Sequence, residues 1–176
     1  MLGIGNSASR GSLAGSDVTQ VQKIVIYESD FSSDADGFTV PVDGSIEGNA
    51  SVGGQDDALK MTLGAEAAAF GYPSGWNNSV YGGSVPNDQV VQVKFLYYFP
   101  STNAGVDSMS FTFDTQEGDT ILDKTQDVWT TYESSIATSG TVINSARFWL
   151  SGGLEGTDAA EGDILYVKNI EIYYYG

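Results

Sequence analysis

Short runs of alternating apolar and polar residues, separated by Gly, Asn, Asp and Ser, fill the chain from Lys23 onward. Such alternation is typical of β-strands with one buried and one solvated face, and frequent turn residues are typical of an all-β sandwich or barrel. The pattern predicts strands over residues 23–31, 38–42, 46–52, 58–63, 79–82, 89–99, 108–114, 128–136, 142–150 and 164–174. We therefore predict an all-β fold, a two-sheet antiparallel β-sandwich of the jelly-roll type.

The alternation also predicts which residues form the core. In the segment 91–99 one face carries only apolar residues, namely Val91, Val93, Phe95, Tyr97 and Phe99. The other face carries Gln92, Lys94, Leu96 and Tyr98. By the same rule Met109, Phe111, Phe113 and Phe148 are expected to be buried. Near the C-terminus, Tyr173 and Tyr175 alternate with Ile172 and Tyr174, so one pair is exposed unless a partner covers it.

Residues 1–22 lack any such period and are rich in Gly, Ser and other small or polar residues. We interpret them as an extended N-terminal arm and residues 23–176 as one jelly-roll domain. The scattered apolar residues of the arm are the expected points of attachment to a partner: Leu2, Ile4, Leu13 and Val18. A helical pattern occurs only over residues 64–70, where one or two turns are expected.

Composition narrows the possible functions. The 176 residues contain 7 Lys and Arg against 23 Asp and Glu, a net charge of −16, which disfavours nucleic acid and membrane surfaces as partners. The chain has no Cys and no His, so the usual zinc and copper sites, cysteine nucleophiles and Ser-His-Asp triads are excluded. Carboxylate chemistry, oxygen-ligated calcium or magnesium, and aromatic binding surfaces remain. The N-terminus lacks the pattern of a secretory signal, and we expect a full-length soluble chain.

Three segments resemble the β-sandwich carbohydrate-binding modules that are appended to plant-polysaccharide hydrolases. They are residues 29–38 (SDFSSDADGF), 53–62 (GGQDDALKMT) and 162–172 (GDILYVKNIEI). The resemblance spans residues 23–175 and implies a jelly roll, with Phe38 in the place of the usual Trp. Trp129 resembles the Trp that opens a core strand in these modules, and we assign it to packing.

The resemblance also raises the question of a structural calcium ion. Members of the family commonly hold one with an Asp pair in the final strand, where this chain has Lys168 and Asn169. If the first and last strands pair as they do in the family, calcium ligands would be supplied by Glu28, Asp30, Asp57 and Asp163. The alternative is that these are ordinary solvated acids of turns.

Two groups of residues are candidates for glycan binding. Tyr72, Trp76 and Tyr81 lie near the amides Asn77 and Asn78, and such rings stack on a pyranose while amides bond its hydroxyl groups. In another predicted strand, Phe148 is expected in the core. Its neighbours Arg147 and Trp149 then share the opposite face, where a cation beside an indole suits sugar or partner recognition. Structural packing of either group is the alternative.

The first residues, Met1 to Ser7, look like the openings of structural proteins of tailed bacteriophages. We therefore expect a virion structural protein, a capsid decoration or tail-associated subunit that is made in the host cytoplasm and located in the virion. Its expected partners are other virion proteins and copies of itself, with weak adhesion to polysaccharide as a secondary role. A secreted or enzyme-appended carbohydrate-binding module, extracellular in location, is the main alternative. A small β-sandwich glycosidase or lyase is a further one, but no acid pair is singled out and we expect no enzyme activity.

Overall fold

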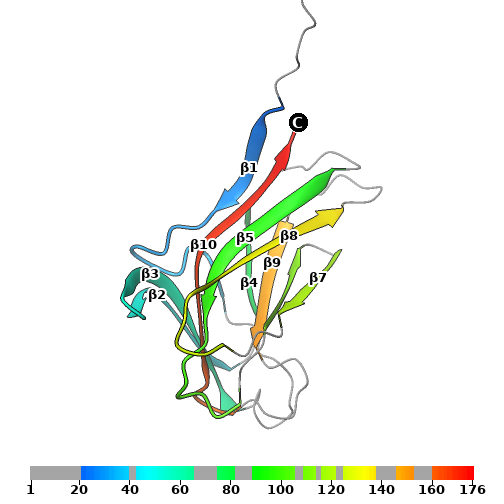
Figure 1. Ribbon diagram of the computed structural model, residues 1–176. Helices are drawn as coiled ribbons and strands as arrows, with labels where there is room; N and C mark the ends of the chain where they lie inside the picture. The colour runs from blue at the N-terminus through cyan, green and yellow to red at the C-terminus, as the bar shows by residue number, and fades with distance from the viewer. Residues whose placement is uncertain are drawn as a thin grey trace, which may run out of the picture.

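The computed structural model describes residues 21–39, 43–65, 75–81, 89–105, 109–113, 116–121, 125–137, 146–152 and 160–176. Two antiparallel sheets are stacked in these residues, with the longer strands in the larger sheet (Figure 1). The predicted antiparallel β-sandwich is confirmed. The predicted arm falls almost entirely outside the described residues, as does most of the predicted helical stretch. No described helix is long and apolar enough to cross a membrane.

Six strands form the larger sheet in the order β2-β3-β10-β5-β8, with β1 also paired to β10. They are β1 (Lys23–Glu28), β2 (Gly44–Val52), β3 (Gln55–Leu63), β5 (Val90–Tyr98), β8 (Thr130–Ala137) and β10 (Ile164–Tyr175). The smaller sheet has the order β4-β9-β6-β7. Its strands are β4 (Gly75–Tyr81), β6 (Met109–Phe113), β7 (Gln116–Ile121) and β9 (Ala146–Gly152).

The core lies between the two sheets. Its largest fully buried side chains include Phe95 of β5, Phe99 directly after β5, and Met109 of β6 in the smaller sheet. All five residues of the predicted apolar face of 91–99 are at most 2% exposed. Phe31 and Phe38 pack edge to face with ring centroids 5.9 Å apart, and both are core residues.

β10 pairs with three other strands of the larger sheet. One of its edges pairs with β5, while the other pairs first with β3 and then with β1. Between Lys168 and Glu171 the strand advances three residues while β5 advances two, from Leu96 to Lys94. This one-residue bulge contains Asn169, whose φ is +52°, a left-handed conformation that Asn tolerates better than most residues.

The bulge preserves the apolar face of β10. Leu165 and Val167 point into the core before it, and Ile170 and Ile172 do so after it, all at most 2% exposed. Without the extra residue the second pair would fall on the outer face, because side chains alternate with a period of two. The bulge is bound to β1 by Ser29, whose N–H donates to the carbonyl of Ile170 and whose Oγ accepts from the Ile170 N–H.

A loop between β5 and β6 fixes the beginning of β10. The Asn103 side chain donates to the carbonyl of Ile164 at 2.7 Å and accepts from its N–H at 2.8 Å. The buried Asp163 carboxylate accepts from the N–H groups of Ala104 and Gly105 at 2.7 and 3.0 Å. The register of β10 is therefore set at its first residue by hydrogen bonds and at its middle by the bulge.

Several strand boundaries differ from the prediction. β7 was not predicted, because its sequence QEGDTI lacks a run of apolar residues. Its extended conformation comes from its pairing with β6 rather than from its own sequence. β4 begins at Gly75 rather than residue 79. The predicted strand 38–42 is reduced to an isolated bridge at residue 39, and residues 40–42 lie outside the described part of the chain.

Substitution of Asn169 tests the role of the bulge. Asn169→Val should lower the free energy of unfolding by about 1–2 kcal/mol, because a β-branched residue is strained at positive φ. Asn169→Gly, which relieves that strain, should change it by a few tenths of a kcal/mol at most. Urea unfolding measures both values. Equal effects of the two substitutions would contradict the assignment of this position to a left-handed bulge.

Candidate functional site

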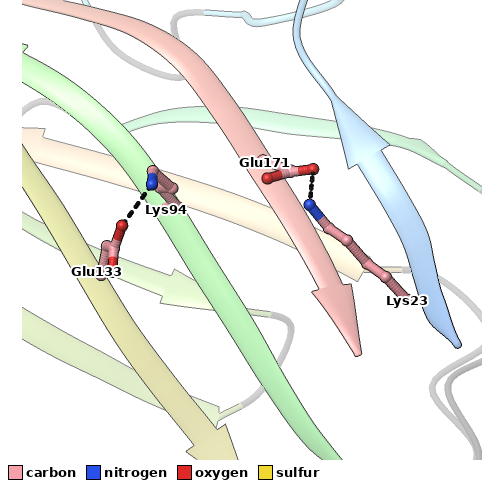
Figure 2. A network of polar contacts seen from close by, with 4 residues as sticks. All are labelled: Lys23, Lys94, Glu133 and Glu171. Carbon is pink, nitrogen blue, oxygen red and sulfur yellow. Dashed lines mark hydrogen bonds and ion pairs between the residues drawn. The ribbon is translucent and has the colours of Figure 1, made fainter. Parts of the chain in front are cut away.

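The outer face of the larger sheet carries a row of four charged side chains on four adjacent strands. They are Lys23 on β1, Glu171 on β10, Lys94 on β5 and Glu133 on β8, as Figure 2 shows. Glu171, Lys94 and Glu133 are register partners across the three strands. Lys23 forms an ion pair with Glu171, and Lys94 Nζ lies 2.5 Å from Glu133 Oε1. The signs alternate across the sheet, so the row has no net charge.

The ion pairs of this row hold their charges at neutral pH. A hydrogen bond to Glu171 raises the pKa of Lys23, and one to Glu133 raises the pKa of Lys94. A raised lysine pKa means that each lysine keeps its positive charge throughout the neutral range and loses it only when the pH rises past that pKa. The four side chains are partly exposed, so they offer both donors and acceptors to a ligand.

Tyrosines and neutral polar groups lie next to the charged row, at the end of this face where β10 ends. The rings of Tyr173 and Tyr175 meet edge to face at 5.6 Å, and Lys23 Nζ lies 4.1 Å from the Tyr173 ring centroid. Tyr175 is 50% exposed, which agrees with the expectation that one tyrosine pair faces outward. On the neighbouring strands Ser135 Oγ donates to Gln92 Oε1 at 2.7 Å.

An aromatic cluster occupies the other end of the same face. Tyr98 has its ring centroid 5.5 Å from that of Trp129 and 6.0 Å from that of Tyr166. Its hydroxyl donates to Asp127 Oδ1 at 3.1 Å. Burial raises the pKa of Tyr98, while hydrogen bonds from Ser101, and the one from Tyr98, lower the pKa of Asp127. Trp129 does pack, as predicted, but on the outer face and outside the core cluster.

The turn between β2 and β3 lies against this aromatic cluster. Trp129 Nε1 donates to the carbonyl of Val52 at 3.1 Å, and Lys168 Nζ donates to the carbonyl of Asp56 at 2.6 Å. Gly53, with φ of +59°, approaches the rings so closely that a Cβ there would lie 2.8 Å from Tyr98 Cε2. The turn therefore covers Tyr98, which explains why a residue on the outer face is only 7% exposed.

These groups make an extended surface suited to a polymer of sugar rings. From Gln92 to Tyr98 the strand runs about 20 Å, at roughly 3.3 Å per residue. Aromatic rings lie at both ends of this length, and hydrogen-bonding side chains lie between them. Planar rings stack on the apolar faces of sugars, and paired acceptors and donors bind hydroxyl groups, so the arrangement can hold a saccharide chain without any reaction.

The described residues among those predicted from sequence to bind glycan lie on the smaller sheet. Trp76, Asn77 and Tyr81 are in β4, and Arg147 and Trp149 are in β9. The two strands pair antiparallel, with Asn77 opposite Trp149. The backbone thus brings the two predicted groups to adjacent strands.

The predicted residues do not all face one another across the two strands. Trp76 stands opposite Leu150, next to the pair formed by Asn77 and Trp149. Tyr72 lies outside the described residues. The predicted attachment residues Leu2, Ile4, Leu13 and Val18 lie there as well. The glycan role of the smaller sheet stays a prediction.

The four acids predicted as calcium ligands do not come together. Glu28 and Asp30 lie at the end of β1, beside the second half of β10, whereas Asp163 precedes the first residue of β10. Asp57 is in β3, six residues from the Leu63 that bonds to Asp163. In the described part of the chain no group of three or more acidic side chains could hold a metal ion. The four predicted ligands therefore do not form such a group, and a structural calcium ion stays a prediction.

Two of these acids have partners that account for them. The Asp163 carboxylate accepts a third backbone hydrogen bond from Ala160, at 3.1 Å, in addition to its two from the β5–β6 loop. Asp30 Oδ1 accepts from the N–H of Ser32 at 3.0 Å, and hydrogen bonds from Ser32 lower the pKa of Asp30. Both are acids that bond the backbone of turns, the alternative that the sequence left open, although Asp163 is buried rather than solvated.

The outer face of the larger sheet was not singled out from sequence. One signal was present, since the polar face of 91–99 contains Leu96 and Tyr98 beside Gln92 and Lys94. A solvated face that carries large apolar residues marks an interaction surface more often than a purely polar one. The contributions of β1, β8 and β10 required the strand order, which the alternation does not contain.

Comparison with solved structures gives carbohydrate-binding modules of the same fold. The xylan-binding domain CBM22-1 of Paenibacillus barcinonensis Xyn10C matches with a TM-score of 0.58 and 14% identity, over 86% of this chain and 94% of that one. The family 16 carbohydrate-binding module-2 matches with a TM-score of 0.52 and 14% identity, over 84% of this chain and 97% of that one. Identities this low establish the fold alone.

A third similar structure contains the fold within an enzyme. It comprises the CBM22-1 and GH10 modules of xylanase 10B from Clostridium thermocellum, in complex with xylohexaose, with a TM-score of 0.58 and 12% identity. The match covers 86% of this chain and 28% of that longer one. Neither a protein-family model nor a curated protein matches the sequence.

Paired glycine substitutions test the contact between the β2–β3 turn and the aromatic cluster. Gly53 and Gly54 both have positive φ, but a Cβ on Gly54 would meet nothing within 4 Å. Gly53→Ala should therefore lower the free energy of unfolding by about 1–3 kcal/mol more than Gly54→Ala, since only the former forces the rings apart. Urea unfolding of both variants gives the difference. Equal losses would show that the turn does not pack on Tyr98 and Trp129.

Proposed function

We propose that this domain is a non-catalytic carbohydrate-binding domain that holds a polysaccharide on the outer face of its larger sheet. The observation that carries the proposal is the arrangement of that face. Rings of Tyr173 and Tyr166 flank a row of ion-paired side chains on four strands, and these groups are partly exposed. The fold shared with carbohydrate-binding modules supports the same function.

Binding at one such site is expected to be weak. Each stacked ring contributes about 0.5–1.5 kcal/mol beyond the area it buries, by analogy with aromatic pairs. A few contacts of this size must offset the loss of freedom of the saccharide and of the side chains that it orders. Single-site affinities should therefore be in the millimolar to high-micromolar range, and useful adhesion would require many copies acting together.

Alanine substitutions of the exposed rings test the site. Xylan is the first ligand to try, because one of the similar domains is described as xylan-binding. Tyr166→Ala and Tyr173→Ala should each weaken binding roughly 2- to 12-fold, the equivalent of one lost stacking contact. Affinity electrophoresis in gels containing xylan, a β-glucan or no polysaccharide measures the change, and thermal melting confirms that each variant is folded.

Trp76→Ala is the matched comparison, because Trp76 belongs to the smaller sheet. If the outer face of the larger sheet is the site, this variant should bind as the parent does. A loss confined to Trp76→Ala would move the site to β4 and β9. Unaltered binding by all three variants would overturn both assignments.

We also propose that the domain works within a virion structural protein, as a capsid decoration or tail-associated subunit. The support is the resemblance of residues 1–7 to the openings of phage structural proteins, together with the Gly- and Ser-rich composition of residues 1–22. In this setting many copies on one particle would supply the avidity that a weak site needs. A carbohydrate-binding domain appended to an enzyme is the alternative, and it agrees with the fold as well.

Deletion of residues 1–22 tests the virion proposal. The shortened protein should keep a cooperative melting transition but no longer sediment with particles, because the arm lacks the periodicity of a core element. Retained co-sedimentation would assign attachment to the sandwich itself. Failure of the full chain to associate with any particle would favour the enzyme-appended alternative.

A further inference from the structure

Lys168 differs from the other lysines whose surroundings the structure describes. Lys23, Lys60 and Lys94 each form an ion pair with a glutamate. Lys168 forms none with any Asp or Glu of the described residues, and its ammonium group donates to the backbone carbonyl of Asp56 instead. In a chain with 23 acidic and 7 basic residues, a lysine without a carboxylate partner is unexpected.

Lys168 lies on the surface proposed to bind sugar. It stands on β10 opposite Leu96 of β5, between the charged row and the aromatic cluster. Its Nζ is 6.0 Å from the ring centroid of Trp129, and the side chain is half-buried. A lysine ammonium has three donors, and the contact to Asp56 uses one of them. The position thus places an ammonium group that forms no ion pair with the described acids near an aromatic ring.

We propose that Lys168 recognises an anionic substituent, a uronate carboxylate or a sulfate ester, on the bound polysaccharide. The inference rests on the proposed function, because it concerns the same face. A charge-assisted hydrogen bond from a half-buried ammonium is stronger than a neutral one, and the adjacent Trp129 ring can pack on the sugar that carries the anion. In the charged row each lysine is balanced by a glutamate, so the row offers no net positive charge to an anion.

The net charge of −16 opposes this recognition only at a distance. Charges more than about 8 Å apart are largely screened at physiological ionic strength, whereas a direct contact is screened much less. The acidic surface would therefore slow the approach of an anionic polymer without removing the local attraction. Lys168 would select among polysaccharides that have already reached the face.

Matched polymers test this inference. Glucuronoxylan is compared with its carboxyl-reduced form, and a sulfated galactan with its desulfated form, by affinity electrophoresis or calorimetry. The parent protein should bind one anionic polymer about fivefold more tightly than its neutral counterpart. Which pair shows the preference identifies the substituent. Lys168→Met should abolish the preference, Lys168→Arg should keep most of it, and Lys60→Met, on β3, should leave it intact.

The outcomes separate the inference from the proposed function. Equal binding of anionic and neutral polymers by the parent would overturn the role of Lys168 while leaving the sugar-binding face supported. If Lys168→Met weakened binding to anionic and neutral polymers equally and also lowered the melting temperature, Lys168 would only stabilise the β2–β3 turn. That result would also overturn its proposed role in anion recognition. Binding of neither polymer type by the parent would contradict the proposed function itself.

Discussion

The structure of the larger sheet depends on one constraint on β10. Its apolar side chains must all face the core although the strand pairs with β3 along its first half and with β1 along its second half. The bulge at Asn169 lies at the change. Because the bulge adds one residue, Val167 and Ile170 both point into the core although three positions separate them. If β10 had no bulge and its side chains alternated strictly, the apolar residues of one half of the strand would face solvent.

The same constraint determines the outer face. Once the inward positions of β10 are set, Tyr166, Lys168, Glu171 and Tyr173 must point outward, and register aligns them with the outward residues of β5 and β8. The row of ion pairs and the aromatic cluster are thus consequences of pairing rather than of local sequence. The β2–β3 turn then covers Tyr98, while the tyrosines at the other end stay partly exposed.

Local alternation sufficed to predict the fold class, most strand positions and the buried face of β5. It could not predict the proposed binding face, because the groups that form it come from four strands widely separated in sequence. Trp129 illustrates the limit, since an aromatic residue at a strand start has the same local pattern whether it packs in the core or outside it. The predicted calcium ligands illustrate the same limit, since acids near strand ends do not meet unless those ends lie together.

Chemical-shift mapping by NMR, with xylohexaose titrated into the labelled domain, tests the central claim most directly. The account predicts that the largest shift changes fall on the backbone amides of β5, β8 and β10 and on the indole N–H of Trp129, with saturation at millimolar or lower concentration. Changes confined to β4 and β9 would contradict it, as would the absence of any change with xylohexaose and with comparable β-glucan and uronate-containing oligosaccharides.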